Sequence, residues 1–260
     1  MEGSTRQARA ERYSIGAVTN ALAILRLVGE RERIGLADAA RAAEVSKSTA
    51  YRLLATLEAA GLVERLPEGG YRAGLEAVRW AMQLMAQLDV RTTAAPYLRQ
   101  LWERTGETAN LALLREGRLV YVEILESALP FRMADVPGSA APLHATALGK
   151  AVAVHLDPHR LAGLLGPEPY PALTVHTATT WRDLRARLDE TRARGFAVDR
   201  EEVALGVTCV AAPILARDEV VGAISVSGPR ARLTDARLAE VAEQVLAAAH
   251  QVSQRLSPRG

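Results

Sequence analysis

The segment 45–61 carries the most distinctive set of chemical groups in this sequence. Four apolar side chains recur in it at the spacing of one helix face: Ala50, Leu53, Leu54 and Leu57. The opposite face would present cations, hydroxyls and one aromatic ring, with no acid among them: Ser46, Lys47, Ser48, Thr49, Tyr51, Arg52 and Thr56. Such groups bind phosphate oxygens and base edges, so the segment predicts a helix that contacts DNA.

Lys47 separates this interpretation from that of an ordinary solvated helix face. A lysine in the first turn opposes the helix dipole, so it is a poor choice for stability. It becomes favourable where the helix start faces phosphates, which bind both the lysine and the free backbone N–H groups. A single polar helix face is usually only solvated. The choice between a DNA-binding helix and an ordinary surface helix therefore depends on the neighbouring segments.

The neighbouring segments match a winged helix-turn-helix. Val18–Val28 and Gly35–Ala43 have the periodicity of two amphipathic helices, and residues 44–46 form the turn before the polar helix. Leu62–Leu66 and Tyr71–Ala73 are short strand candidates around a Pro-Glu-Gly-Gly turn signal. We therefore expect a DNA-binding domain over residues 14–74, with its third helix in the major groove of double-stranded DNA.

Two finer expectations concern side chains of this domain. The apolar residues of its first helix would form one buried stripe: Val18, Leu22, Leu25 and Val28. Arg65 and Arg72 of the hairpin, the wing, are expected to reach phosphate.

The composition suits two domains and says little about nucleic acid. The chain has 260 residues, of which 49% are apolar, and its 32 cations nearly balance its 30 acids. Residues 1–90 hold 12 cations and 11 acids, so the DNA argument depends on where charge lies and not on its amount. The single cysteine, Cys209, excludes an internal disulfide and fits a reducing compartment. Without a signal peptide or a spanning apolar run, we expect a cytoplasmic protein with no membrane partner.

Two segments flank the predicted DNA-binding domain. Residues 1–13 are polar, with arginines at 6, 9 and 12, and are predicted to be a mobile arm. Residues 75–90 are predicted to be a linker that begins with a helix, Leu75–Leu88, with apolar residues on more than one side. Such a helix buries two surfaces, against either a partner subunit or its own second domain, and the sequence leaves both open.

The second domain is predicted over residues 91–260 as an α+β fold with antiparallel strands and helices on one side. Its expected helices are Thr92–Thr105, Thr146–His155, Pro158–Leu165, Trp181–Arg194 and Thr234–Leu256. Its expected strands are Ala109–Leu114, Leu119–Leu125, Phe131–Ala134, Val207–Leu215 and Val220–Ser227.

Polar groups in this second domain indicate a ligand site. Ser225 and Ser227 alternate with apolar residues, so both hydroxyls lie on one face of a strand. Backbone amides at a helix start bind anions, which suits a ligand carboxylate over Ala147–Leu148. Leu111 and Met133 are candidate apolar lining residues, although such residues belong to the core by default.

Three motifs in this order resemble the IclR family of bacterial transcriptional regulators. They are PLHATALGK at 142–150, GFAVDREEVALGVTCVAAP at 195–213 and ISVSG at 224–228, together with the helix-turn-helix. The resemblance spans about residues 14–256. It implies a GAF-like effector-binding domain, assembly as a homodimer or homotetramer, and small organic acids or aromatic compounds as effectors. Because a winged helix reads one half-site and a dimer reads a palindrome, we expect a palindromic operator. No cofactor is implied.

The resemblance also implies which residues hold the effector: Ala147, Leu148, Asp199, Cys209, Ser225 and Ser227. This sequence departs from the family at Arg200, where many relatives carry a second acid. The local charge, and with it the preferred ligand, is expected to differ there.

Three alternatives to a ligand-controlled regulator are an enzyme, a metal-binding protein and a structural DNA-binding protein. Cys209 with His144 and Asp199 could form a cysteine nucleophile, but no oxyanion loop or nucleophile elbow accompanies them. His155 and His159 are four residues apart, yet Pro158 interrupts the helix that would align them on a metal. A purely structural DNA-binding protein would leave the polar motifs of the second domain without a purpose.

Overall fold

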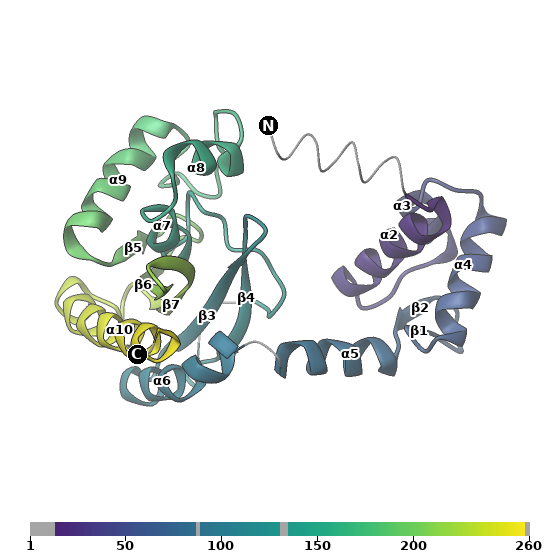
Figure 1. The fold of residues 1–260 in the computed structure, drawn as a ribbon, viewed down its shortest axis with the longest axis horizontal. Helices are drawn as coiled ribbons and strands as arrows, with labels where there is room; N and C mark the ends of the chain where they lie inside the picture. The colour runs from purple at the N-terminus through teal and green to yellow at the C-terminus, as the bar shows by residue number, and fades with distance from the viewer. Residues whose placement is uncertain (1–13, 87–88, 131–134, 258–260) are drawn as a thin grey trace. The chain divides into compact units, whose positions relative to one another are not determined.

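The computed structural model describes residues 14–86, 89–130 and 135–257, and divides the chain into two units between residues 87 and 88 (Figure 1). This division falls within the linker predicted at 75–90. Each unit has its own apolar core. Among the described residues, no helix combines the length and the apolar character needed to cross a bilayer.

The first unit is a winged helix-turn-helix, as predicted. Two antiparallel strands follow three helices, and Ile34 joins the second strand through two backbone hydrogen bonds of 2.9 Å with Tyr71. The elements are α2 (Gly16–Glu30), α3 (Leu36–Ala42), α4 (Lys47–Ala59), β1 (Val63–Arg65) and β2 (Tyr71–Ala73). Their buried side chains form one cluster that includes Ile34, Leu54 and Tyr71.

The buried face of α2 differs from the predicted stripe. Ile24 and Val28 are buried, whereas Val18 and Leu22 are 53% and 50% exposed. At about 100° of rotation per residue, Leu22 lies roughly 160° around the helix from Ile24, so the two cannot share one buried face. The predicted stripe is therefore wrong at Val18 and Leu22 and left out Ile24, whereas Val28 is buried and Leu25 packs against the core as predicted.

The turn between α3 and α4 sets the direction of α4. Glu44 takes a left-handed conformation with φ of 52°, just after the end of α3. Ser46 then caps α4, because its Oγ accepts a hydrogen bond of 3.2 Å from the Thr49 N–H. The turn and cap together position the polar face of α4.

Helix α5 (Leu75–Ala86) follows the wing, and α6 (Asp89–Thr105) begins the second unit. Five apolar side chains of α5 are at least 47% exposed: Leu75, Val78, Trp80, Met82 and Leu84. The linker helix therefore presents an apolar surface, as the sequence indicates.

The second unit is built on a five-stranded antiparallel sheet of order β4-β3-β7-β6-β5. Its strands are β3 (Thr108–Arg115), β4 (Arg118–Leu125), β5 (Ala197–Arg200), β6 (Val207–Ala216) and β7 (Glu219–Pro229). Strand β5 was not predicted, because four residues that include an acid and a base give no periodic apolar signal. The strand predicted at 131–134 lies outside the described residues.

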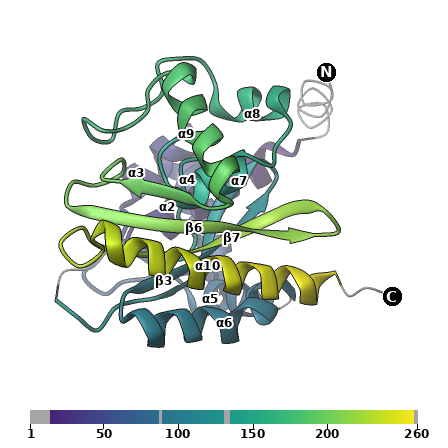
Figure 2. The same cartoon turned by 90° about the vertical axis from the view of Figure 1, so that its left-hand side faces the viewer.

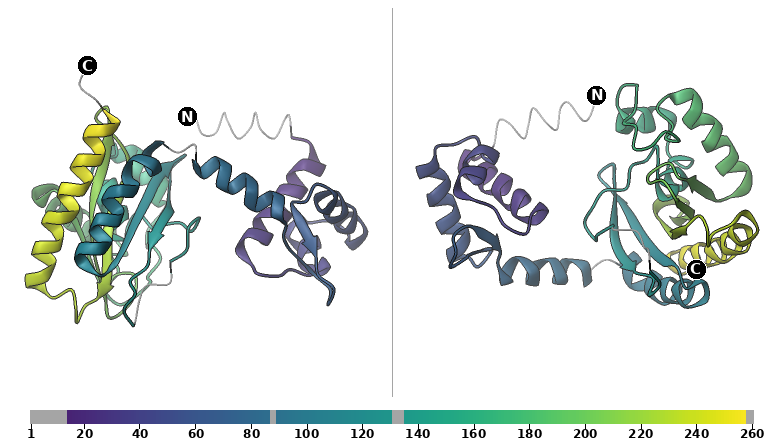
Figure 3. Two further views of the ribbon diagram at one scale, coloured as in Figure 1. Left: turned by 90° about the horizontal axis from the view of Figure 1, so that it is seen from below. Right: turned by 180° about the vertical axis from the view of Figure 1, so that it is seen from behind.

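Helices cover both faces of this sheet, which corrects the expectation of helices on one side (Figure 2). Helices α6 and α10 (Asp235–Leu256) pack side by side on one face (Figure 3). Helix α7 (Ala147–Ala153) packs on the other face against β5, β6 and β7, with α9 (Trp181–Arg194) beside it. Helix α8 (Pro158–Leu165) lies between α7 and α9 in the chain. Helical periodicity predicts a helix but not which face of a sheet it covers.

Candidate functional site

The polar face of α4 is exposed to solvent along its whole length. Ala50, Leu54 and Leu57 are buried on the other side of the helix. The exposed face contains each residue predicted to contact DNA: Ser46, Lys47, Ser48, Thr49, Tyr51, Arg52 and Thr56. Local hydrogen bonds hold part of this face in place, because the Ser46 Oγ lies 2.8 Å from the Ser48 Oγ.

The two cations of α4 are available to a partner. In the part of the chain that the structure describes, neither Lys47 nor Arg52 has a side-chain hydrogen bond or an ion pair. The Thr56 hydroxyl donates to the Arg52 carbonyl at 3.0 Å. The hydroxyl oxygen of Thr56 can therefore still accept a hydrogen bond.

The two arginines of the wing differ in charge environment. Arg72 forms a bidentate pair with Glu64, with hydrogen bonds of 3.1 and 3.2 Å. Arg65 follows Glu64 in β1, so the side chain of Arg65 projects from the face of the hairpin opposite to that of Glu64. Because Glu64 offsets the charge of Arg72, Arg65 is the better candidate for a phosphate contact.

The second unit contains a small polar cavity between the start of α7 and the sheet. Eleven described residues line it: Asn110, Tyr121, Asp135, Thr146, Ala147, Leu148, Asp199, Val203, Cys209, Ser225 and Ser227. The volume open to the centre of a water molecule is about 10 Å³, roughly enough for one water. A larger ligand therefore requires the lining to separate.

The structure brings together six of the residues expected to hold an effector and excludes a seventh. Ala147, Leu148, Asp199, Cys209, Ser225 and Ser227 all line the cavity. Leu111 does not, because it pairs with Ile224 while Asn110 pairs with Ser225, and adjacent residues of a strand face opposite sides of the sheet. Leu111 is a core residue beneath α6 and α10. Met133 lies outside the described residues.

Close packing at the start of α7 requires a glycine. A Cβ atom at Gly149 would lie 2.3 Å from the Pro142 carbonyl oxygen and 2.6 Å from the Leu143 Cα. Thr146 caps the helix, accepting from the Gly149 N–H at 2.8 Å and donating to the Pro142 carbonyl at 2.8 Å. The N–H groups of Ala147 and Leu148, in the first turn, have no partner within the helix.

Asn110 is the most important lining residue that the sequence reasoning missed. Its Nδ2 donates to the Ser225 and Ser227 hydroxyls, both at 3.1 Å, so it ties the two serines together. The available signal was an asparagine inside the otherwise apolar run ANLALL at 109–114 of β3. Tyr121, Asp135, Thr146 and Val203 were also missed as lining residues.

Asp199 is the central ionisable group of the cavity. Its side chain is buried, and its Oδ1 accepts a hydrogen bond of 2.6 Å from the Glu202 N–H. Burial raises the pKa of Asp199 to about 7, although the charge of Lys150 and this hydrogen bond oppose the rise. The carboxyl group therefore changes charge near neutral pH.

The pKa values of the remaining ionisable groups of the lining are shifted toward the neutral forms. Burial, followed by the Asp199 charge, raises the pKa of the Cys209 thiol well above its ordinary value. Burial also raises the pKa of Asp135, while a hydrogen bond from Tyr121 opposes the rise. His144 is bound to the Pro171 carbonyl at 2.9 Å and does not line the cavity. A cysteine nucleophile would need a thiolate beside an imidazole, and the geometry provides neither.

Metal binding has no support among the residues that the structure describes. No group of three or more His, Cys, Asp and Glu side chains is placed there to hold a metal ion. His155 lies in the segment between α7 and α8, whereas His159 lies in α8.

A buried ion cluster supports the cavity from behind. Lys150, only 1% exposed, donates from Nζ to Glu202 Oε1, and Arg187 pairs with the other oxygen of Glu202. Burial lowers the pKa of Lys150, and Glu202 opposes this by stabilising the ammonium form. The Thr177 hydroxyl donates to the Glu202 carbonyl at 2.6 Å. Glu202 thus connects α7, α9 and the loop before α9.

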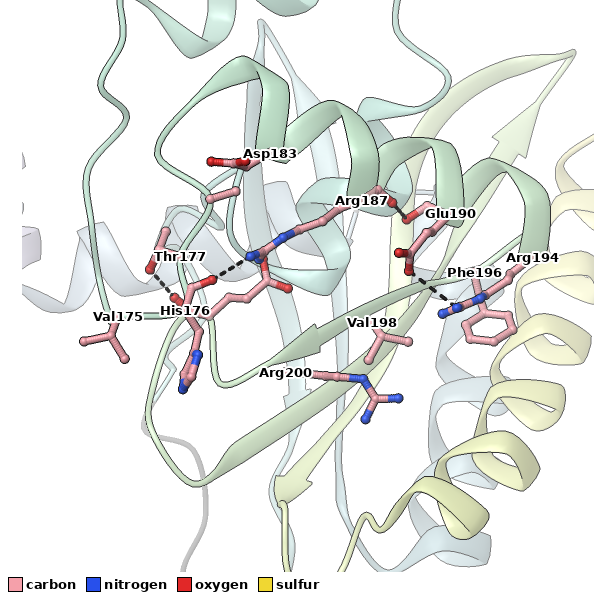
Figure 4. Close-up of a pocket in the computed structure, with 13 residues that line it drawn as sticks. Val175, His176, Thr177, Asp183, Arg187, Glu190, Arg194, Phe196, Val198 and Arg200 are labelled. Carbon is pink, nitrogen blue, oxygen red and sulfur yellow. Dashed lines mark hydrogen bonds and ion pairs between the residues drawn. The ribbon is translucent and has the colours of Figure 1, made fainter.

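A larger open cleft lies on the far side of this cluster, between α9 and β5 (Figure 4). Its volume is about 520 Å³, and its arginines are already paired with acids or carbonyls. Arg187 donates to the His176 carbonyl at 2.7 Å, and Arg194 pairs with Glu190 at 3.4 Å. Arg200 pairs with Asp235 and lines this cleft instead of the small polar cavity. The departure at Arg200 therefore adds no charge to the lining around Asp199.

A winged helix-turn-helix whose third helix carries cations that no described residue pairs with, and a second unit with a buried polar cavity, are typical of one class of protein, the effector-responsive transcriptional regulators. The chain belongs to the IclR family of these regulators. Residues 17–67 match the IclR helix-turn-helix domain, and residues 82–254 match the family described as bacterial transcriptional regulator IclR, C-terminal. Proteins of this family are transcriptional regulators and not enzymes, so the cysteine-nucleophile alternative is set aside.

Individual relatives are similar to this chain over nearly its whole length. The HTH-type transcriptional regulator BhcR of Paracoccus denitrificans is 35% identical over 94% of this chain and 88% of its own length. XynR of Escherichia coli, of the same type, is 36% identical over 93% of this chain and 97% of its own. The crystal structure of a putative IclR regulator from Silicibacter sp. TM1040 superposes with a TM-score of 0.79 at 30% identity, covering 94% and 97% of the two chains.

The ion cluster behind the cavity gives a first prediction. Replacing Glu202 with Gln leaves Lys150 buried without its partner, so the free energy of unfolding is expected to fall by about 3–5 kcal/mol. Urea unfolding measures this. Glu190→Gln is the matched control, because it breaks an exposed pair and should cost less than about 1 kcal/mol. Equal losses in the two variants would contradict a structural role for the cluster.

Proposed function

We propose that this protein binds a palindromic DNA operator as a homodimer or homotetramer, and that a small organic acid or aromatic effector controls its affinity for the operator. The polar cavity beside α7 is the observation that supports control by an effector. Its buried carboxyl, hydroxyl, amide and backbone N–H groups are more than an apolar core needs. Operator binding rests on the exposed, uncompensated cations of α4.

The DNA contacts are assigned by their position on the helix. Thr49, Arg52 and Thr56 follow one row along the exposed face of α4, which suits contact with base edges in the major groove. Lys47 at the helix start and Arg65 in the wing suit contact with phosphates.

The assembly is assigned to α5. A single winged helix reads one half-site, whereas a two-fold dimer reads a palindrome with twice the contacts. The exposed apolar residues of α5 need a cover, and a second copy of the same helix provides one.

The effector is placed by matching charges in the cavity. A ligand carboxylate fits against the free N–H groups of Ala147 and Leu148, within reach of the serine hydroxyls of β7. Asp199 must then be protonated, or must accept from a ligand hydroxyl, because two bare carboxylates in contact repel each other. Since the cavity holds only about one water as it stands, the ligand-bound and ligand-free forms differ in shape. Regulation requires such a difference.

The first prediction from this proposal concerns base recognition. Arg52→Ala should weaken specific operator binding by about 1–3 kcal/mol, the range of one good base contact. Arg52→Lys keeps the charge and loses the two-pronged geometry, so it should lose specificity while retaining binding to random DNA. Lys47→Ala should weaken both kinds of binding and make their salt dependence shallower. Gel shifts on operator and scrambled duplexes at two salt concentrations measure these effects. Unchanged affinities would contradict the proposal that α4 binds in the major groove.

The second prediction concerns assembly. Met82→Glu places a charge in the proposed interface, so light scattering should show a larger monomer fraction and operator binding should lose cooperativity. Gln83→Glu adds the same charge at the neighbouring exposed position without removing an apolar contact, and it serves as the control. An unchanged oligomer in the Met82 variant would place the interface elsewhere.

The third prediction concerns pH. An anionic ligand binds the protonated form of Asp199 more tightly, so its dissociation constant should rise about tenfold between pH 6 and pH 8, around the Asp199 pKa of about 7. The sign follows from proton uptake on binding, which becomes harder as pH rises. Isothermal titration with benzoate or lactate measures this. Asp199→Asn cannot titrate, so its affinity should stay flat across the same range, and a flat wild-type profile would contradict the placement of the carboxylate.

A further inference from the structure

Asn110 has a polar atom for which the described part of the protein provides no partner. The residue is 2% exposed and lines the cavity from the sheet side. Its Nδ2 is used by the two serine hydroxyls, while its Oδ1 is buried and accepts no hydrogen bond from the residues described. Buried polar atoms are nearly always paired, so this oxygen marks a place for a ligand atom or a water.

The orientation of the amide does not change this conclusion. If the side-chain amide is turned by 180°, its oxygen accepts from both serines, and its NH₂ group is left facing the place of the present oxygen. A hydroxyl group both donates and accepts, so it completes the hydrogen bonding of Asn110 in either orientation. A carboxylate only accepts, and therefore fails to satisfy the orientation with the free oxygen.

The charge of the lining restricts the rest of the ligand. The described lining residues include two carboxyl groups, Asp135 and Asp199, and no cationic side chain. Lys150, the nearest ammonium group, is engaged by Glu202. One ligand carboxylate can be held by backbone N–H groups of α7, but a second would face these acids without a counter-charge.

We propose that Asn110 recognises a hydroxyl group of the effector, and that the effector is therefore a hydroxylated monocarboxylate and not a plain carboxylate or a dicarboxylate. The inference rests on the proposed function, in which this cavity is the effector site. A site that is built to bond a hydroxyl discriminates strongly against the analogue that lacks it, because its own polar group is then left unpaired.

Matched ligand pairs test the proposal on the wild-type protein. Isothermal titration would compare benzoate with its 2-, 3- and 4-hydroxy derivatives and propionate with lactate, and would include phthalate as a dicarboxylate. At least one hydroxy acid should bind ten- to a hundredfold more tightly than its parent acid, and phthalate should bind more weakly than benzoate. If the parent acids bind as tightly as every hydroxy acid, the role of Asn110 is wrong while the cavity remains the effector site. If no acid binds at all, the proposed function itself fails.

Variants locate the discrimination. Asn110→Leu keeps the approximate shape of the side chain and removes its polar atoms, so the advantage of the hydroxy acid should shrink to less than about threefold. Leu111→Met is the control, since the neighbouring residue faces the opposite side of the sheet and should leave the advantage unchanged. Retained discrimination in the Asn110 variant would overturn the proposal.

A spectroscopic measurement needs no variant. The chain contains two asparagines, Asn20 and Asn110, so protein labelled with [15N]asparagine gives two side-chain amide signals, of which the Asn20 signal is an internal reference in the other unit. The preferred hydroxy acid should shift the Asn110 amide signal more than its parent acid does. Equal shifts with both ligands would contradict a direct contact.

Discussion

The arrangement of the second unit depends on how it buries charge beside α7. Asp199, Glu202 and Lys150 all lie inside the protein, where an unpaired ion is costly. Glu202 reduces this cost, because its carboxylate forms ion pairs with Lys150 of α7 and Arg187 of α9. Its backbone N–H group also donates a hydrogen bond to Asp199. The same residue thereby fixes two helices and the end of β5 in relation to one another. The start of α7, with its free N–H groups, is held over β6 and β7 as a result.

This allocation of charge explains why Asp199 titrates near neutral pH. The charge of Lys150 acts on Asp199, but the ammonium group itself donates to Glu202. Asp199 receives only the more distant effect of that charge and backbone hydrogen bonds from Glu202 and Val203, which do not overcome the cost of burial. The cavity therefore contains an acid whose charge an entering anion can change at little cost. A fully paired aspartate would have stayed ionised and would have repelled the same anion.

Local sequence signals predicted the first unit well and the second unit only in part. The caps, turns and apolar spacing of α3, α4 and the hairpin are local properties, so these elements and the exposed face of α4 follow from residue types. The cavity residues Asp199 and Cys209 came from resemblance to a family and not from local physics. Strand β3 is buried on both faces, so no alternation showed that Asn110, and not Leu111, faces the cavity. Lys150 and Glu202 lie 52 residues apart, and only the folded chain brings them together.

Features that oppose the stability of the isolated chain occur where a partner is proposed to bind. Lys47 lies at the positive end of α4, the apolar side chains of α5 face solvent, and the Asn110 amide has a buried atom that no described residue pairs with. Each feature costs free energy in the unliganded chain, and each would gain from phosphate, a second subunit or a ligand hydroxyl respectively. Residues chosen for folding alone would remove all three. A cost that is relieved only in the complex adds to the free energy of binding, so these local conflicts are where specificity for a partner can be built into an otherwise consistent fold.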